Sequence, residues 1–271
     1  MYADDWLRER LVLKGGNALS LVYKIGDRTS LDLDFSIEGD FDDVDSVSSK
    51  IENALVTTFE QEDIVVFDFI LTPKPESNTV PWWGGYQAEF KLIPRPVAYE
   101  ASMRVEDMRR RALTVDPGSQ RRKYIIQISK FEYASAREER NVGGFFVRVY
   151  PPVLLSAEKL RALVQQHPEY EPIPSYAKRS RARDFYDIWA ICEHFAIKLD
   201  MHLDTVRAVF DAKGVDLVLL GKLKELKALH MASWADVELA ISSHIESFDY
   251  YFDYVVAIAE NLYTQWKEHT P

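Results

Sequence analysis

Two aspartates lie two positions apart in a short segment whose polar and apolar residues alternate. Residues 28–35 read Arg-Thr-Ser-Leu-Asp-Leu-Asp-Phe. Successive side chains of a β-strand point to opposite faces, so Ser30, Asp32 and Asp34 share one face. The two carboxylates then stand ~7 Å apart along the strand. Mg²⁺ takes one or two such carboxylates and completes its shell with substrate phosphates. The segment therefore predicts that Asp32 and Asp34 hold Mg²⁺ and a nucleotide.

A glycine pair precedes this strand and adds a second feature of phosphate chemistry. Lys14, Gly15 and Gly16 end a short apolar run and lead into a helical turn. Two successive glycines let backbone N–H groups approach a phosphate closely. We expect these three residues and Ser30 to bind the nucleotide. Arg28 either adds positive charge there or is a solvated turn residue.

Neither motif is specific alone, but their order and spacing are informative. The segments KGGNAL (14–19) and RTSLDLDF (28–35) have the layout of polymerase-β-like nucleotidyltransferases, and they resemble the AbiEii family of nucleotidyltransferase toxins. Two later segments, LSAEKLRAL (155–163) and RARDFYDI (181–188), resemble further motifs of that family in the same order.

The resemblance implies an activity, two further site residues and several partners. It implies Mg²⁺-dependent transfer of a nucleotide from an NTP to an RNA acceptor, tRNA in known relatives, and control by an antitoxin protein. It places Lys159 and Asp184 in the active cleft. Without it, Lys159 is an exposed helical lysine, and Arg183 and Asp187 form a surface pair one helical turn apart. We expect Asp187 to orient lysine or arginine side chains.

The third carboxylate of polymerase-β-like enzymes, commonly a general base, has no obvious counterpart. The corresponding strand carries Gln127, which cannot act as a base. Glu89 could replace it, or could equally be a solvent-facing partner of Lys91, and Asp184 is another candidate. Two other functions therefore stay open. One is nucleotidylation of a small molecule or a protein hydroxyl, and the other is a degenerate protein that binds a nucleotide or a partner without catalysis.

Composition bounds the class of protein. The chain has 271 residues, 47% of them hydrophobic and 28% charged, with a net charge of −10. No apolar run is long enough to span a membrane, and the single cysteine, Cys192, excludes an internal disulfide, so we expect a cytoplasmic protein without membrane partners. An acidic chain does not favour broad nucleic-acid binding. Two basic clusters, residues 104–123 and Lys178 to Arg183, are therefore the expected contacts for RNA.

The order of elements predicts an α+β fold. Strands and mixed elements come first and helices follow. We expect a nucleotidyltransferase domain with a mixed sheet at 1–154, and a helical bundle at 155–271 that contributes Lys159 and Asp184 to the cleft. Residues 94–122 are expected to be irregular, and Ser156 to be the N-cap of the first bundle helix. The expected strands are 11–14, 30–37, 64–71, 86–93, 124–133 and 145–151, and the expected helices include 42–61, 181–196, 202–212, 215–230 and 234–266.

Overall fold

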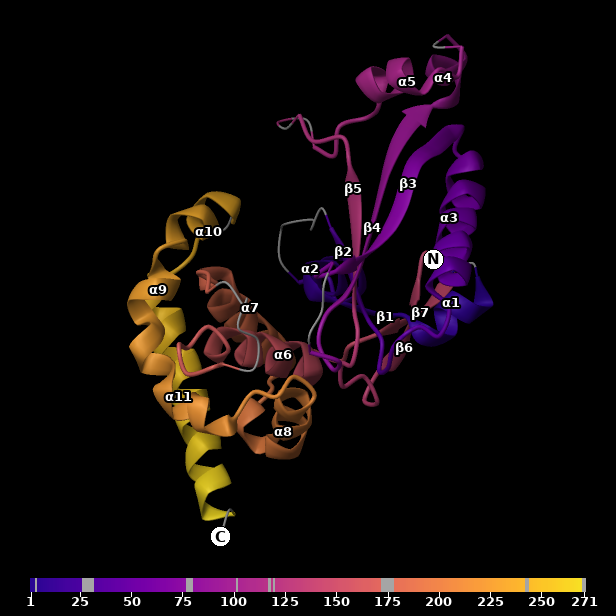
Figure 1. Cartoon of the computed structure of the whole chain (residues 1–271). Coiled ribbons are helices and arrows are strands. Elements are labelled where there is room, and N and C mark those ends of the chain that lie inside the picture. Colours follow the sequence, from indigo (N-terminus) through magenta and orange to yellow (C-terminus); the bar gives the residue numbers. More distant parts are fainter. Residues whose placement is uncertain are drawn as a thin grey trace. The chain divides into compact units, whose positions relative to one another are not determined.

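The computed structural model (Figure 1) describes residues 1–2, 4–25, 32–76, 80–100, 102–116, 118, 120–171, 178–241 and 244–269. Internal contacts divide the chain into two compact units. We call the first the sheet unit; it comprises Met1–Asn17, Thr29–Phe131 and Glu139–Val149. The second, the helical unit, comprises Ala18–Arg28, Glu132–Glu138 and Tyr150–Pro271.

Seven strands of the described chain form one mixed sheet, in the order β3-β4-β5-β2-β1-β7-β6. The predicted α+β class is confirmed. The strand β6 was not predicted, because its sequence, Glu-Glu-Arg-Asn-Val, shows no apolar alternation. The strands are β1 (Val12–Lys14), β2 (Leu33–Ser36), β3 (Ile64–Lys74), β4 (Gly85–Pro94), β5 (Tyr124–Ser129), β6 (Glu138–Val142) and β7 (Phe145–Val149).

The register of the central strands separates a polar face from an apolar face. Asp34 of β2 lies opposite Lys14 of the antiparallel β1 and opposite Gln127 of the parallel β5. In turn, Gln127 lies opposite Gln87 of β4. Residues directly opposite each other in a sheet share a face, so one face carries this polar row. The other face carries buried side chains, among them Phe35, Ala88, Phe90, Ile126 and Ile128.

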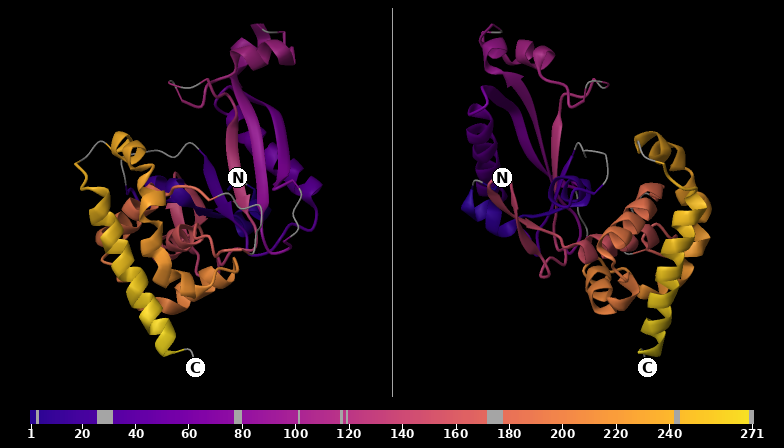
Figure 2. Two further views of the ribbon diagram at one scale, coloured as in Figure 1. Left: turned by 60° about the vertical axis from the view of Figure 1, so that its left-hand side comes forward. Right: turned by 180° about the vertical axis from the view of Figure 1, so that it is seen from behind.

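One long helix and two short ones come from the first 60 residues of the sheet unit. Helix α3 (Val44–Glu60) is capped by Asp43, which accepts a hydrogen bond from the Ser46 amide, and its residues Val47 and Ile51 are buried. It packs on β3 and runs alongside the sheet in every view (Figures 1 and 2). Helix α1 (Asp5–Arg10) and the single turn α2 (Gly15–Asn17) complete this part of the unit.

Residues 94–122 are not irregular throughout, which corrects the prediction. They form α4 (Arg95–Glu100) and α5 (Val105–Arg111), whose Ala98 and Met108 pack with Ile93 of the sheet. The three arginines of α5 each have a carboxylate partner. The pairs are Arg109 with Asp68 and Glu106, Arg110 with Asp107, and Arg111 with Glu100.

The helical unit packs around aromatic side chains. Phe185, Phe248 and Tyr251 are each 2% exposed or less. The long helix α11 packs along the segment η3 (Figure 2). The helices are α6 (Pro152–Val164), α7 (Ala182–Phe195), α8 (Leu203–Asp211), α9 (Lys227–Met231), α10 (Trp234–Ala240) and α11 (Phe248–Glu268). Tighter or wider turns form η1 (Ala18–Val22), η2 (Leu199–Met201) and η3 (Leu217–Leu226).

Two details of the predicted helices are wrong. Helix α6 begins at Pro152, so Ser156 is a buried residue inside the helix rather than its N-cap. Proline suits a first helical position because its fixed φ is already helical and no amide hydrogen is needed there. The expected helix at 234–266 is two helices, since α10 ends at Ala240 and α11 begins at Phe248. None of the helices described here is long and apolar enough to cross a membrane.

Candidate active site

The carboxylate of Asp34 rests against the backbone of Gly15. The chain leaves β1 through Gly15 at a φ of +67°, a conformation that favours glycine. A Cβ atom on this residue would lie 2.6 Å from Oδ2 of Asp34 and 3.2 Å from its Cγ. Lys14, buried at the end of β1, lies opposite Asp34 in the sheet, and Gly16 follows in α2. The structure thus brings Lys14, Gly15 and Asp34 together.

Two side chains that sequence reasoning did not assign to the site contact Asp32. The buried amide of Asn17 donates a hydrogen bond to the main-chain carbonyl of Asp32 at 2.7 Å. The guanidinium of Arg121 donates to Oδ1 of Asp32 at 2.5 Å. Asn17 adjoins the glycine pair, which is a usable sequence signal, whereas Arg121 lies 89 residues away. The predicted nucleotide ligands Arg28 and Ser30 fall outside the described residues.

Gln127 occupies the neighbouring-strand position beside Asp34, as predicted, and its side chain is exposed. Glu89 lies on β4, two strands from β2, which is a lateral separation of about 10 Å. Its carboxylate accepts hydrogen bonds from Lys123 at 2.6 Å and Gln87 at 2.7 Å. The Lys123 contact, more than any other, lowers the pKa of Glu89 below its usual value. Glu89 is therefore poorly placed to complete a site at Asp34.

The interpretation of Glu89 as a partner of Lys91 is wrong. Nζ of Lys91 donates instead to Asp68 at 2.8 Å. Asp68 also accepts from Arg109, and these contacts lower its pKa to about 2. Asp68 of β3 therefore ties α5 to the sheet through Arg109 and contacts the neighbouring strand β4 through Lys91.

The pair Asp32 and Asp34 suits Mg²⁺ by its chemistry. Within the part of the chain that the structure describes, no group of three or more His, Cys, Asp or Glu side chains could hold a metal ion. That excludes an all-protein cage there and leaves a two-carboxylate donor set. Mg²⁺ uses such a set, because it is commonly bound by one or two carboxylates together with substrate phosphates. The donor types at Asp32 and Asp34 therefore fit a magnesium–nucleotide site.

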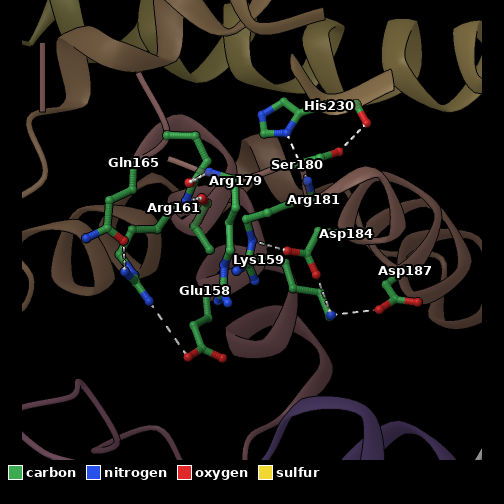
Figure 3. A network of polar contacts seen from close by, with 12 residues as sticks. Glu158, Lys159, Arg161, Gln165, Arg179, Ser180, Arg181, Asp184, Asp187 and His230 are labelled. Carbon is green, nitrogen blue, oxygen red and sulfur yellow. Dashed lines mark hydrogen bonds and ion pairs between the residues drawn. The ribbon is translucent and has the colours of Figure 1, made fainter. Parts of the chain in front are cut away.

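In the helical unit, Lys159 of α6 is held between two aspartates of α7. Its Nζ donates to Asp184 at 2.9 Å and to Asp187 at 2.7 Å (Figure 3). The three side chains are 12%, 9% and 8% exposed, so Lys159 is not an exposed helical lysine. Burial by itself would lower the pKa of Lys159, but attraction to the two carboxylates raises it overall. Lys159 is therefore a fixed, permanently charged ammonium group.

Each aspartate has a second cationic neighbour from its own helix. Nε of Arg181 donates to Asp184 at 2.5 Å, and Nε of Arg183 lies 3.6 Å from Asp187. The second pair is not a surface pair, since Asp187 is almost fully buried. Burial opposes ionisation of Asp184, yet Arg181 and Lys159 together hold its pKa well below the usual range. A carboxylate with so low a pKa and both oxygens engaged is a poor general base, which counts against that candidate role.

A buried histidine, His230, forms hydrogen bonds with the residues that precede helix α7. The Nδ1 atom of His230 accepts a hydrogen bond from the backbone amide of Arg181 at 3.2 Å (Figure 3). Ser180 donates to the carbonyl of His230 at 2.7 Å. Burial lowers the pKa of His230 to about 4, so the ring is neutral at pH 7 and can accept this bond. Nothing in the sequence indicated His230, because a lone histidine 49 positions from its partner carries no pattern.

Two solved structures resemble this chain at low sequence identity. One solved structure, a protein of H. pylori assigned to the nucleotidyltransferases, shares 18% identity at a TM-score of 0.46 and covers 98% of this chain and 92% of its own. A nucleotidyltransferase-like antigen of Paracoccidioides brasiliensis shares 16% identity at a TM-score of 0.33, over 68% and 67%. Neither TM-score reaches 0.5, so neither likeness supports a conclusion. No curated protein matches the sequence.

The family comparison is decisive because it spans most of the chain. Residues 1–256 match the family described as "Nucleotidyl transferase AbiEii toxin, Type IV TA system". This range includes all four segments from which the resemblance was inferred. Membership implies a nucleotidyltransferase with an antitoxin partner. The chain therefore belongs to the AbiEii family of nucleotidyltransferase toxins of type IV toxin–antitoxin systems.

Proposed function

We propose that this toxin transfers a nucleotide from an NTP to an RNA acceptor of the tRNA class, with Mg²⁺ held by Asp32 and Asp34. The observation that carries the proposal is the position of the Asp34 carboxylate against Gly15, on strand β2, whose first residue, Leu33, directly follows Asp32. Carboxylate oxygens suit the metal, and the backbone N–H groups of a glycine pair suit phosphate oxygens, which are the two kinds of contact that a metal-bound triphosphate needs.

In the proposed reaction, a hydroxyl oxygen of the acceptor attacks the α-phosphorus, the bond to pyrophosphate breaks, and the hydroxyl proton passes to solvent water. A bound divalent cation supplies charge neutralisation at the phosphates. The backbone of Gly15 and Gly16 binds phosphate oxygens, and Asp32 and Asp34 fix the position of the nucleotide. Positioning and charge provide most of the acceleration in phosphoryl transfer, so a weak or absent general base is compatible with activity.

We assign Lys159 and Asp184 to the same reaction. Lys159 is a compact cation of the kind that binds phosphate. Asp184 and Asp187 keep Lys159 protonated and fix the direction of its ammonium group. This assignment makes Asp184 a positioning residue in place of a proton acceptor, in agreement with its low pKa.

One observation favours a second candidate function, that of a degenerate protein that binds a nucleotide without transferring it. Gln127 stands where a third carboxylate is common in the superfamily, directly beside Asp34. Gln127 cannot take a proton from the acceptor hydroxyl. The two functions differ in whether label from an NTP becomes covalently attached to any acceptor.

The test is transfer of label from each of four α-labelled NTPs in the presence of Mg²⁺, with total RNA, a protein extract and a metabolite fraction as separate acceptors. We expect labelled RNA with the wild type and none with Asp32→Asn or Asp34→Asn. Asp45→Asn, on the exposed side of α3, is the matched control and retains activity. Label in the protein or metabolite fraction alone would replace the RNA acceptor by one of these. NTP binding with no label in any fraction would establish the degenerate function.

A further inference from the structure

We propose that Arg121 is an internal counterion that couples metal binding to nucleotide binding at the site described above. It holds Asp32 when no metal is bound, and it binds nucleotide phosphate once the metal takes that carboxylate. This inference rests on the proposed function, since it assumes that Asp32 is a metal ligand. It assigns to Arg121 a role different from the RNA contact expected of the basic segment 104–123.

The contact itself sets Arg121 apart from other arginines of the segment. Its Nη2 lies 2.5 Å from Oδ1 of Asp32, and the two side chains are 37% and 30% exposed. By contrast, Arg104 and Arg110 both pair with Asp107, three residues away on the same helix. Those short-range pairs are a common feature of exposed helices. Arg121 instead crosses from another part of the chain to a carboxylate of the proposed metal site.

The backbone around Arg121 is fixed, so the long side chain is the part that can move. The carbonyl of Arg121 accepts a hydrogen bond from the amide of Val115 at 2.8 Å. The next residue, Arg122, donates to the carbonyl of Ala112, and the hydroxyl of Tyr124 donates to the carbonyl of Thr114 at 3.2 Å. These contacts hold residues 121–124 against residues 112–115, immediately before β5. The guanidinium can therefore change partners without unfolding its surroundings.

Because both groups are positively charged, Arg121 and a divalent metal ion cannot bind Asp32 at the same time. A divalent cation on Asp32 places two positive charges where the guanidinium now lies, and like charges at this range repel. A triphosphate that arrives with the metal brings oxygen acceptors into the same site. Guanidinium groups match phosphate oxygens in geometry, often through two hydrogen bonds. Arg121 therefore opposes binding of the metal alone and favours binding of the metal with a nucleotide.

The test measures binding, not activity. Mn²⁺ serves as the probe metal, with its free concentration followed by electron paramagnetic resonance, alone and with a non-hydrolysable NTP analogue. We expect Arg121→Ala to bind Mn²⁺ alone more tightly and the Mn²⁺–analogue complex more weakly. A loss of about tenfold in the coupling between the two ligands lies within the usual range for linked sites. Arg110→Ala, which removes an exposed arginine paired on its own helix, is the control and changes neither affinity.

Two results would overturn the proposal. Equal affinities in Arg121→Ala and wild type would make the contact an ordinary surface ion pair. Weaker binding of Mn²⁺ alone in the variant would mean that Arg121 supports the metal site and does not compete for it. Asp34→Asn, measured in parallel, separates this failure from failure of the proposed function. If that variant binds Mn²⁺ as the wild type does, the metal site itself is wrong; if only the Arg121 expectations fail, the metal site stands.

Discussion

Replacement of Lys159 by methionine tests the buried network of the helical unit. The side chain keeps nearly the same length, while the ammonium group that Asp184 and Asp187 share is lost. Asp184 then keeps its contact with Arg181, and Asp187 keeps only Arg183 at 3.6 Å. Removal of one partner from a buried ion pair typically costs about 3–5 kcal/mol, because a charge is left buried without compensation. We expect a loss of that size in the free energy of unfolding at pH 7.

The loss should depend on pH with a definite sign. In the wild type the pKa of Asp184 lies below its unfolded value, so its contribution is present above about pH 4 and declines as the pH falls further. In the variant Asp184 has lost one of the two cations that lower its pKa, so it gains a proton more readily than in the wild type. Acidification from pH 7 towards pH 4.5 therefore removes part of the unfavourable buried charge in the variant but not in the wild type. The difference in stability between the two proteins should shrink over this interval.

Urea denaturation followed by far-ultraviolet circular dichroism measures both effects. Lys224→Met is the control, since the pair of Lys224 with Glu260 is exposed (61% and 47%), and such pairs are worth about 1 kcal/mol or less. Lys159→Met combined with Asp187→Asn should recover part of the lost stability, because one unpaired charge is removed with its partner. A cost for Lys159→Met below about 1 kcal/mol, equal at all pH values, would refute the buried network.

Three further predictions address other parts of the structure. Gly15→Ala should lower the free energy of unfolding by at least about 1 kcal/mol and abolish nucleotide transfer, because the backbone of Gly15 is left-handed and the new Cβ would displace the Asp34 carboxylate. Gly39→Ala, which has open space around it, should change neither the denaturation curve nor the transfer activity. In a thermal-shift assay Mg²⁺–NTP should stabilise the protein more than NTP alone does. At a hundredfold excess over its dissociation constant, Mg²⁺–NTP should add about 2.7 kcal/mol to the free energy of unfolding of the unliganded protein. Equal shifts with and without Mg²⁺ would contradict a carboxylate–metal site. The pKa of His230 lies below its unfolded value of ~6.5, so on acidification the unfolded chain binds a proton that the folded protein does not. The free energy of unfolding should therefore fall by roughly 2 kcal/mol from pH 7 to pH 5. His230→Phe should reduce this pH dependence, and an unchanged slope would exclude His230 as its source.

Features that depend on neighbours in sequence could be predicted from the sequence. The alternation around Asp32 and Asp34 indicated a strand with one polar face, and β2 has Phe35 buried on the opposite face. The apolar spacing of 42–61 indicated the buried face of α3. The motif segments identified the family, and the family match confirms it over residues 1–256. These signals are local, since strand and helix periods and short motifs repeat over a few residues.

Features that depend on charge pairing between distant segments required the tertiary structure. The basic stretch near α5 suggested RNA binding, but its arginines pair with carboxylates, and Arg121 reaches Asp32 across 89 positions. The sequence of its own helix predicts that Lys159 is exposed. Only the packing of α6 on α7 buries Lys159 between two aspartates. Two charged side chains form an ion pair only when the fold brings them within a few ångströms of each other. The helix and strand periodicity of the sequence does not reveal which distant residues come that close. Sequence therefore determined the family and the elements that bear its motifs, whereas the tertiary structure decided which charges face each other.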